Sequence, residues 1–172
     1  SLPNSFFSEN TTYQLLQNRV EKYPDANCLG YRPKLNTGYG PYEWLSGRQV
    51  LGLVDAVAAG MVGLLHLHRG DYCGIFSHNR YEWFIAEFAM QRHGIIPIPL
   101  YPTLGNEGLD FILNQLELKY IFSGSPIKRA VELIGRHASV GLVSFDDVAD
   151  AAVEKHVNFS QLIAYGREHP VE

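Results

Sequence analysis

Gly70-Asp71-Tyr72-Cys73-Gly74-Ile75-Phe76-Ser77-His78-Asn79-Arg80-Tyr81-Glu82-Trp83 is the stretch of sequence that decides the fold. Its apolar run, Tyr72 to Phe76, has the length of a buried strand and ends in a polar turn. An amphipathic segment follows over 81–93, and a second apolar run follows over 95–100. This alternation is typical of a βαβ unit and therefore predicts a parallel sheet.

The same alternation continues to the end of the chain. Helices are predicted over about 103–118 and 125–136, the second with Ser125 as N-cap and Pro126 as first helical residue. Strands are predicted over 120–122 and 140–145, followed by a short helix capped by Asp146 or Asp147 and by a last strand and helix over about 156–167. We therefore predict an α/β fold with a mostly parallel, doubly wound, flavodoxin-like sheet flanked by helices.

The amino-terminal part has a different pattern. Thr11 with Gln14 forms a capping box that predicts a helix to about Lys22, with Leu15, Leu16 and Val20 buried. Two short runs, 28–32 and 42–45, predict a small antiparallel β-hairpin. Residues 1–10 are expected to form an extended arm, and the chain 1–172 is expected to be a single unit.

Two further patterns predict packing. Ser46 with Gln49 forms a second capping box, and the long helix expected after it, to about residue 67, contains three glycines. Glycine costs a helix up to about 1 kcal/mol against alanine, so Gly52, Gly60 and Gly63 indicate close contact with a neighbouring element. Pro97 and Pro99 lack N–H groups on the same side of their strand, which predicts one complete and one weak or absent neighbour.

Composition excludes several classes of protein. The chain has 172 residues, 46% of them hydrophobic, and a formal net charge of −4 with no basic run, which argues against nucleic-acid binding. No segment approaches the roughly 20 apolar residues of a membrane span. Cys28 and Cys73 match no metal spacing and are expected to be buried free thiols. Because the first residue is Ser1, we expect a trimmed or processed start.

Ligands of parallel sheets bind beyond the carboxyl ends of the strands. Four loops should meet at that rim: Ser77–Arg80, Tyr101–Thr103, Ser123–Ser125 and Phe145–Asp147. Neither a dinucleotide fingerprint nor a phosphate loop of the Gly-x-x-x-x-Gly-Lys-Ser/Thr type occurs. Residues 123–128 are the nearest equivalent of an anion cradle, or else an ordinary capped helix start.

No catalytic residue and no metal ligand can be assigned from the residues alone. His78 lies in a rim turn, where it could touch a ligand or hydrogen-bond within the turn. Plainer interpretations, as surface or packing residues, apply to His66, His68, Glu82, Glu87, Trp44 and Trp83.

Three blocks of sequence carry a resemblance to a known family. They are Gly40-Pro41-Tyr42-Glu43-Trp44-Leu45-Ser46, the opening stretch from Gly70 to Trp83, and Pro99-Leu100-Tyr101-Pro102-Thr103-Leu104-Gly105. Together they resemble the long-chain fatty-acyl-CoA synthetases of the acyl-adenylate-forming superfamily, over nearly the whole chain. Gly47, where a Tyr is usual, and Pro97 depart from the family pattern without altering the assignment.

The resemblance implies an amino-terminal portion of a larger adenylation (AMP-binding) domain. The parent enzyme would use ATP and Mg²⁺ to convert a long-chain fatty acid to acyl-AMP and would then pass the acyl group to CoA. The family's phosphate loop, Mg²⁺-binding Glu and catalytic Lys match nothing in this sequence, so the chain alone should not catalyse and should bind no cofactor. We expect its partner to be the remainder of its own domain, and we expect the isolated chain to self-associate. The parent should be intracellular; its association with the endoplasmic reticulum, peroxisome or mitochondrial surface depends on residues outside this chain.

The resemblance also implies a CoA subsite. In the similar acetyl-CoA synthetases, the loop equivalent to Tyr101, Pro102 and Thr103 touches the CoA nucleotide, and basic residues near Lys128 and Arg129 meet its phosphates. Two rival interpretations stay open: a fragment of another adenylate-forming ligase, and a non-catalytic flavodoxin-like binding or interaction module.

Overall fold

The computed structural model describes residues 11–124, 127–137, 139–149 and 151–171. The backbone packs as two compact units, Ser1–Gly52 and Leu53–Glu172. The single unit expected over 1–172 stays a prediction. The expected arm over 1–10 and the N-cap at Ser125 with Pro126 lie outside the described residues.

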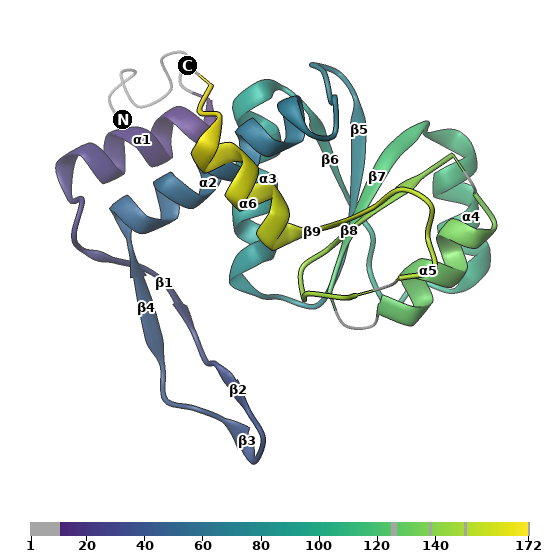
Figure 1. Ribbon diagram of the computed structural model, residues 1–172, viewed down its shortest axis with the longest axis horizontal. Helices are drawn as coiled ribbons and strands as arrows, with labels where there is room; N and C mark the ends of the chain where they lie inside the picture. Colours follow the sequence, from purple (N-terminus) through teal and green to yellow (C-terminus); the bar gives the residue numbers. More distant parts are fainter. Residues whose placement is uncertain (1–10, 125–126, 138, 150, 172) are drawn as a thin grey trace, which may run out of the picture. The chain divides into compact units, whose positions relative to one another are not determined.

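A five-stranded parallel sheet forms the centre of the second unit (Figure 1). Its strands are β5 (Tyr72–Phe76), β6 (Ile96–Pro99), β7 (Leu118–Ser123), β8 (Gly141–Ser144) and β9 (His156–Asn158). They lie in the order β6-β5-β7-β8-β9, with the first strand between the second and the third. This is the flavodoxin-like order, so the predicted doubly wound α/β fold is confirmed.

Helices cover both faces of this sheet (Figure 1). One face carries α4 (Asn106–Gln115) and α5 (Ile127–Gly135), and the other carries α3 (Tyr81–His93) and α6 (Phe159–Glu168). The core under α4 and α5 consists of fully buried apolar side chains from both helices and from the strands, including Leu109, Leu133, Phe76, Ile121 and Leu142. A sheet buried on both faces explains why its strands are continuous apolar runs.

Strand β6 is an edge strand with β5 as its neighbour, as its prolines predict. The Ile96 N–H donates to the Asp71 carbonyl at 2.8 Å, and the Leu100 N–H donates to the Ile75 carbonyl at 2.9 Å. The positions of Pro97 and Pro99 therefore face away from β5, where no ladder hydrogen bond is needed.

Two of the three helix glycines make the close contacts expected of them. In α2 (Gly47–Gly63), a Cβ at Gly60 would lie 2.6 Å from the Leu162 carbonyl oxygen, and one at Gly63 would lie 2.5 Å from the Tyr165 ring. A Cβ at Gly52 would meet nothing within 4 Å, so the prediction for Gly52 is wrong. On the facing helix, Gly166 allows a still closer approach of the Ala56 backbone.

The first unit contains α1 (Thr12–Lys22) and an antiparallel pair, β1 (Asn27–Tyr31) with β4 (Glu43–Ser46). The predicted hairpin is confirmed, and a second pair, β2 (Lys34–Leu35) with β3 (Gly38–Tyr39), extends it. Both capping boxes are present: Thr11 with Gln14, and Ser46 with Gln49. In α1, however, Leu15 is exposed and Tyr13 is buried in its place.

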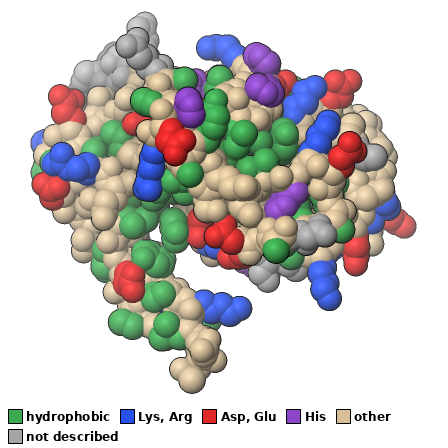
Figure 2. Space-filling model, in the orientation of Figure 1, with side chains coloured by type: hydrophobic (Ala, Val, Ile, Leu, Met, Phe, Trp, Pro, Cys, Tyr) green, Lys and Arg blue, Asp and Glu red, His purple; other side chains and the backbone are tan. Residues whose placement is uncertain are grey.

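The hairpin of the first unit exposes large apolar side chains. Leu35, Tyr39, Tyr42 and Trp44 are each more than half exposed, and Figure 2 shows hydrophobic side chains gathered on this hairpin. Trp44 stacks against Tyr42 and lies over Gly30. Trp44 is therefore a packing residue within the hairpin, as expected, although about half of its surface is exposed.

Both cysteines are free thiols, as expected. Cys73 is buried in β5, and desolvation raises the pKa of its thiol to about 12, so the unreactive thiol form prevails at neutral pH. Cys28 is only partly buried. Within the described part of the chain, no helix is long and apolar enough to cross a membrane.

Candidate functional site

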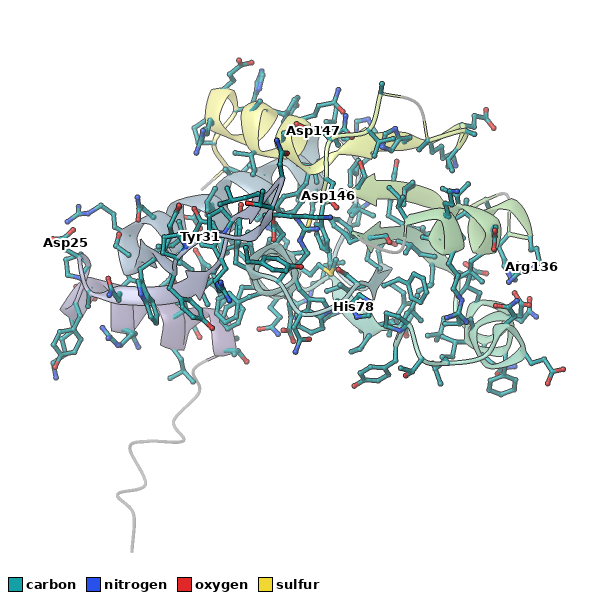
Figure 3. The ribbon with its side chains drawn as sticks, turned by 90° about the horizontal axis from the view of Figure 1, so that it is seen from below. Asp25, Tyr31, His78, Arg136, Asp146 and Asp147 are labelled. Carbon is teal, nitrogen blue, oxygen red and sulfur yellow. The ribbon has the colours of Figure 1, made fainter. Side chains whose placement is uncertain are left out.

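The loops that follow β5, β6, β7 and β8 meet at the carboxyl ends of the strands, because the four strands are parallel. His78, from the first of these loops, and Asp146, from the last, are labelled in Figure 3. Three buried serines also mark these strand ends: Ser77, Ser123 and Ser144. The described part of the rim predicted from the sequence is thus present, and these polar groups belong to three separate segments of the chain.

Arg80 binds two carboxylates at this rim. Its Nε and Nη2 donate to Glu82 Oε2 and Oε1, both at 2.8 Å, and its Nη1 and Nη2 donate to Asp146 Oδ2 and Oδ1 at 3.0 and 2.9 Å. The hydrogen bond to Glu82, above all, raises the pKa of the guanidinium above its ordinary value. Because two carboxylates already neutralise it, Arg80 is not available to an anionic ligand.

This network corrects two expectations. Glu82 was expected on a solvated face, but it is only 7% exposed and is held by Arg80. Asp146 or Asp147 was expected to cap a short helix, but residues 145–149 contain no helix. Asp146 binds Arg80, and Asp147 accepts a hydrogen bond from Ser160 of α6.

The β7–α5 loop passes close to Arg80. A Cβ at Gly124 would lie 2.7 Å from Arg80 Nη1 and 3.1 Å from Ser77 Oγ. Only glycine therefore fits there without displacing the Arg80 guanidinium from its carboxylates. The buried Ser123 hydroxyl donates to backbone carbonyls, at 2.8 Å to that of Phe76. The Ser123 hydroxyl is thus used within the protein, whereas the residues at which a helix start or an anion cradle would form, 125–126, lie outside the described residues, so the two alternatives stay open.

Arg129 reaches from α5 to the β6–α4 loop. Its Nη1 donates to the Pro102 carbonyl, and its Nη2 donates to the Leu104 carbonyl and, at 3.3 Å, to Asn106 Oδ1. The structure therefore brings Arg129 together with the Tyr101–Thr103 segment. Tyr101 and Thr103 are exposed beside it, whereas Pro102 is half-buried.

Lys128 differs from its neighbour. Its side chain is exposed, and it forms no ion pair with any residue that the structure describes. His78 is likewise exposed at the rim, and its imidazole has no hydrogen bond within the described part of the chain, so the turn-capping interpretation is not seen. Among the described rim residues, these two side chains are therefore open to a ligand, as are those of Tyr101 and Thr103.

One serine–histidine pair resembles a nucleophile with its base. Ser144 Oγ lies 2.9 Å from His156 Nε2, but the serine is fully buried and donates its proton to Asn158 Oδ1 at 2.7 Å. Asn158 in turn bonds the Val148 backbone and caps α6. The pair joins β8 to β9, and no substrate could reach it.

Sequence reasoning could not have found the Arg80–Asp146 contact, which joins residues 66 positions apart. The Arg80–Glu82 spacing ahead of a helix was visible, but nothing in it distinguishes a buried pair from a solvated one. Among the described residues, no group of three His, Cys, Asp or Glu side chains is placed to hold a metal ion.

Comparison with known proteins places this chain in a family. A family model described as AMP-binding enzyme matches residues 16–170. Fatty acyl-CoA synthetase A of Dictyostelium discoideum is 32% identical over 139 residues, which cover 80% of this chain and 20% of that protein. Human long-chain-fatty-acid–CoA ligase 1 is 34% identical over 132 residues, covering 76% of this chain and 18% of that protein.

The fold is similar to that of solved adenylation domains. The A-PCP didomain of a carboxylic acid reductase from Segniliparus rugosus, solved in complex with AMP, superposes with a TM-score of 0.81 at 16% identity, covering 96% of this chain and 28% of that one. The chain spans about a fifth of the length of the curated relatives that it matches. Because the family model spans nearly all of it, the chain belongs to the AMP-binding enzyme family.

Proposed function

We propose that this chain is the amino-terminal portion of an ATP-dependent long-chain fatty acid–CoA ligase. The observation that carries the proposal is 32–34% identity, over three quarters or more of the chain, to proteins named as fatty acyl-CoA synthetases and ligases. The parent would form acyl-AMP from the fatty acid and ATP with Mg²⁺, and would then transfer the acyl group to CoA. The parent would be intracellular and associated with a membrane, because its substrate partitions into membranes; whether that membrane belongs to the endoplasmic reticulum, peroxisome or mitochondrion depends on residues outside this chain.

Within that enzyme, the chain would supply a sheet layer and no catalytic group. The phosphate loop, the Mg²⁺-binding Glu and the catalytic Lys of the family would come from the remainder of the adenylation domain, its nearest partner. The coding sequence beyond Glu172 tests this proposal. A Ser/Thr/Gly-rich loop ending in Pro-Lys-Gly within the next thirty or so codons is expected, and its absence would favour a non-catalytic module.

The substrate class is tested on the full-length protein. We expect ATP–pyrophosphate exchange that depends on a long-chain fatty acid, and AMP release that depends on CoA. Exchange driven only by an aromatic acid or an amino acid would instead favour another adenylate-forming ligase, which the low-identity structural neighbours leave open.

We propose a CoA subsite at the rim, formed by Tyr101, Pro102, Thr103, Lys128 and Arg129. The proximity of Arg129 to the Tyr101–Thr103 segment and the open position of Lys128 support it. In the full-length enzyme, Lys128→Ala combined with Arg129→Ala should raise the KM for CoA at least about tenfold, the equivalent of one lost charge-assisted hydrogen bond. Acyl-AMP formation, measured by pyrophosphate exchange, should stay nearly unchanged. An unaltered KM for CoA would contradict the proposed subsite.

The isolated chain is expected to self-associate through its exposed hairpin. Contiguous apolar surface of this kind marks an interaction site, which the remainder of the domain would cover in the parent. Light scattering should therefore find species larger than a monomer, and Leu35→Ser with Tyr39→Ser should shift them toward monomer. A wild-type chain that stays monomeric at high concentration would contradict the expectation.

A further inference from the structure

We propose that Arg129 is a positioning residue that holds the β6–α4 turn, and that Lys128 alone supplies the mobile charge of the proposed CoA subsite. The inference rests on the proposed function only for the identity of the ligand. The holding role itself follows from hydrogen bonds within the described chain.

The turn has few bonds of its own. It runs from Tyr101 to Leu104 and is closed by one hydrogen bond, from the Leu104 N–H to the Tyr101 carbonyl at 2.9 Å. Pro102 occupies its second position, which suits a β-turn but removes a donor. Gly105, the N-cap of α4, offers no side-chain cap. The carbonyls of Pro102 and Leu104 therefore depend on a partner outside the turn.

Arg129 is that partner. Its two Nη atoms serve two backbone carbonyls and the Asn106 amide oxygen at once, which a planar fork of five N–H donors can do. The guanidinium also lies over the ring of the buried Phe76, 5.7 Å from its centroid. Its orientation is thus fixed by the turn on one side and by β5 on the other.

Lys128 has the opposite character. Successive residues of a helix point about 100° apart, so its side chain leaves α5 in a different direction from that of Arg129. It is exposed and has no ion pair among the residues that the structure describes. An ammonium on a flexible stem can move to contact a phosphate as a point charge. Arg129 would first have to break its hydrogen bonds to the Pro102 and Leu104 carbonyls.

The two residues should therefore respond differently to conservative substitution. Arg129→Lys keeps the charge, but a single ammonium cannot serve three acceptors in the geometry of the fork. It should release the turn nearly as fully as Arg129→Ala does. Lys128→Arg should be tolerated, and Lys128→Gln should remove charge without disturbing the turn.

Amide hydrogen exchange and CoA kinetics on the full-length protein separate these effects. Arg129→Lys should accelerate exchange of the Leu104 N–H at least about tenfold and raise the KM for CoA about tenfold, with kcat and pyrophosphate exchange nearly unchanged. Lys128→Gln should raise the KM for CoA and leave Leu104 exchange at the wild-type rate. Arg136→Lys, just past the end of α5, is the matched control and should change neither readout.

The outcomes distinguish the two proposals. Wild-type Leu104 exchange in both Arg129→Lys and Arg129→Ala overturns the holding role. Faster Leu104 exchange in the Arg129 variants, with an unchanged KM for CoA in every variant, supports the holding role of Arg129 and contradicts the proposed CoA subsite. A KM for CoA that rises in Arg129→Ala but not in Arg129→Lys shows direct phosphate contact by charge, and it overturns the division of roles.

Discussion

Replacing Gly166 with alanine should lower the free energy of unfolding of the chain by about 3 kcal/mol, at the upper end of the usual cost of overpacking. A Cβ at this position would lie 1.8 Å from the Ala56 carbonyl oxygen and 2.6 Å from its carbonyl carbon. These are backbone atoms of α2 and cannot rotate aside, so the two helices would have to separate. Urea unfolding, followed by circular dichroism, measures the shift in midpoint.

Gly108→Ala is the control for that experiment. Gly108 lies within α4, and a Cβ there would meet nothing within 4 Å. The same substitution should raise the free energy of unfolding by about 0.5–1 kcal/mol, because alanine is the better helix former. Equal and small effects at both positions would show that α2 and α6 are not in close contact.

Removing the Arg80 guanidinium should lower the free energy of unfolding by a comparable amount, for an electrostatic reason. Arg80→Met leaves the Glu82 carboxylate, whose side chain is only 10% exposed, without its cation. Breaking a buried ion pair by removing one partner costs about 3–5 kcal/mol, and because Arg80 is partly exposed we expect a loss of about 3 kcal/mol. The midpoint of urea unfolding is again the measurement.

Asp146→Asn provides the matched comparison. The Asp146 side chain is 58% exposed, so solvent screens its pair with Arg80, and its loss should cost less than about 1 kcal/mol. Arg80→Lys should recover only part of the stability, because an ammonium cannot bind both carboxylates bidentately. If Arg80→Met and Asp146→Asn cost the same, the buried position of Glu82 would not be the source of the effect.

The fold was predictable because its signals are local. Strand length, helical spacing, both capping boxes and the prolines of β6 each depend on a few neighbouring residues, and each predicted its element. The ends were less accurate: the helices expected to about residue 67 and over about 103–118 end at Gly63 and Gln115. Burial in α1 was not predictable in the same way, since Leu15 and Leu16 are adjacent apolar residues and only packing decides which is buried. Likewise, nothing in the sequence distinguishes Gly60 and Gly63, which are in close contact with α6, from Gly52, which is not.

The candidate site was predictable in position and less so in role. Parallel strands fix which loops meet, so the neighbourhood of Arg129 and the Tyr101–Thr103 segment followed from topology. Whether a guanidinium binds backbone carbonyls, a carboxylate or a ligand depends on contacts between distant segments. Asp146 with Arg80 is the clearest case, because neither residue carries a local sign of the other.

The one-sided pairing of β6 has a consequence for assembly. An exposed strand edge is a template on which a second chain can add, and proteins guard such edges against aggregation. On β6 the outward positions are Pro97 and Pro99, which offer no N–H donor to an incoming strand, so extension of the sheet is disfavoured at this end. We therefore expect any strand contributed by the remainder of the protein to add at the opposite edge, beside β9.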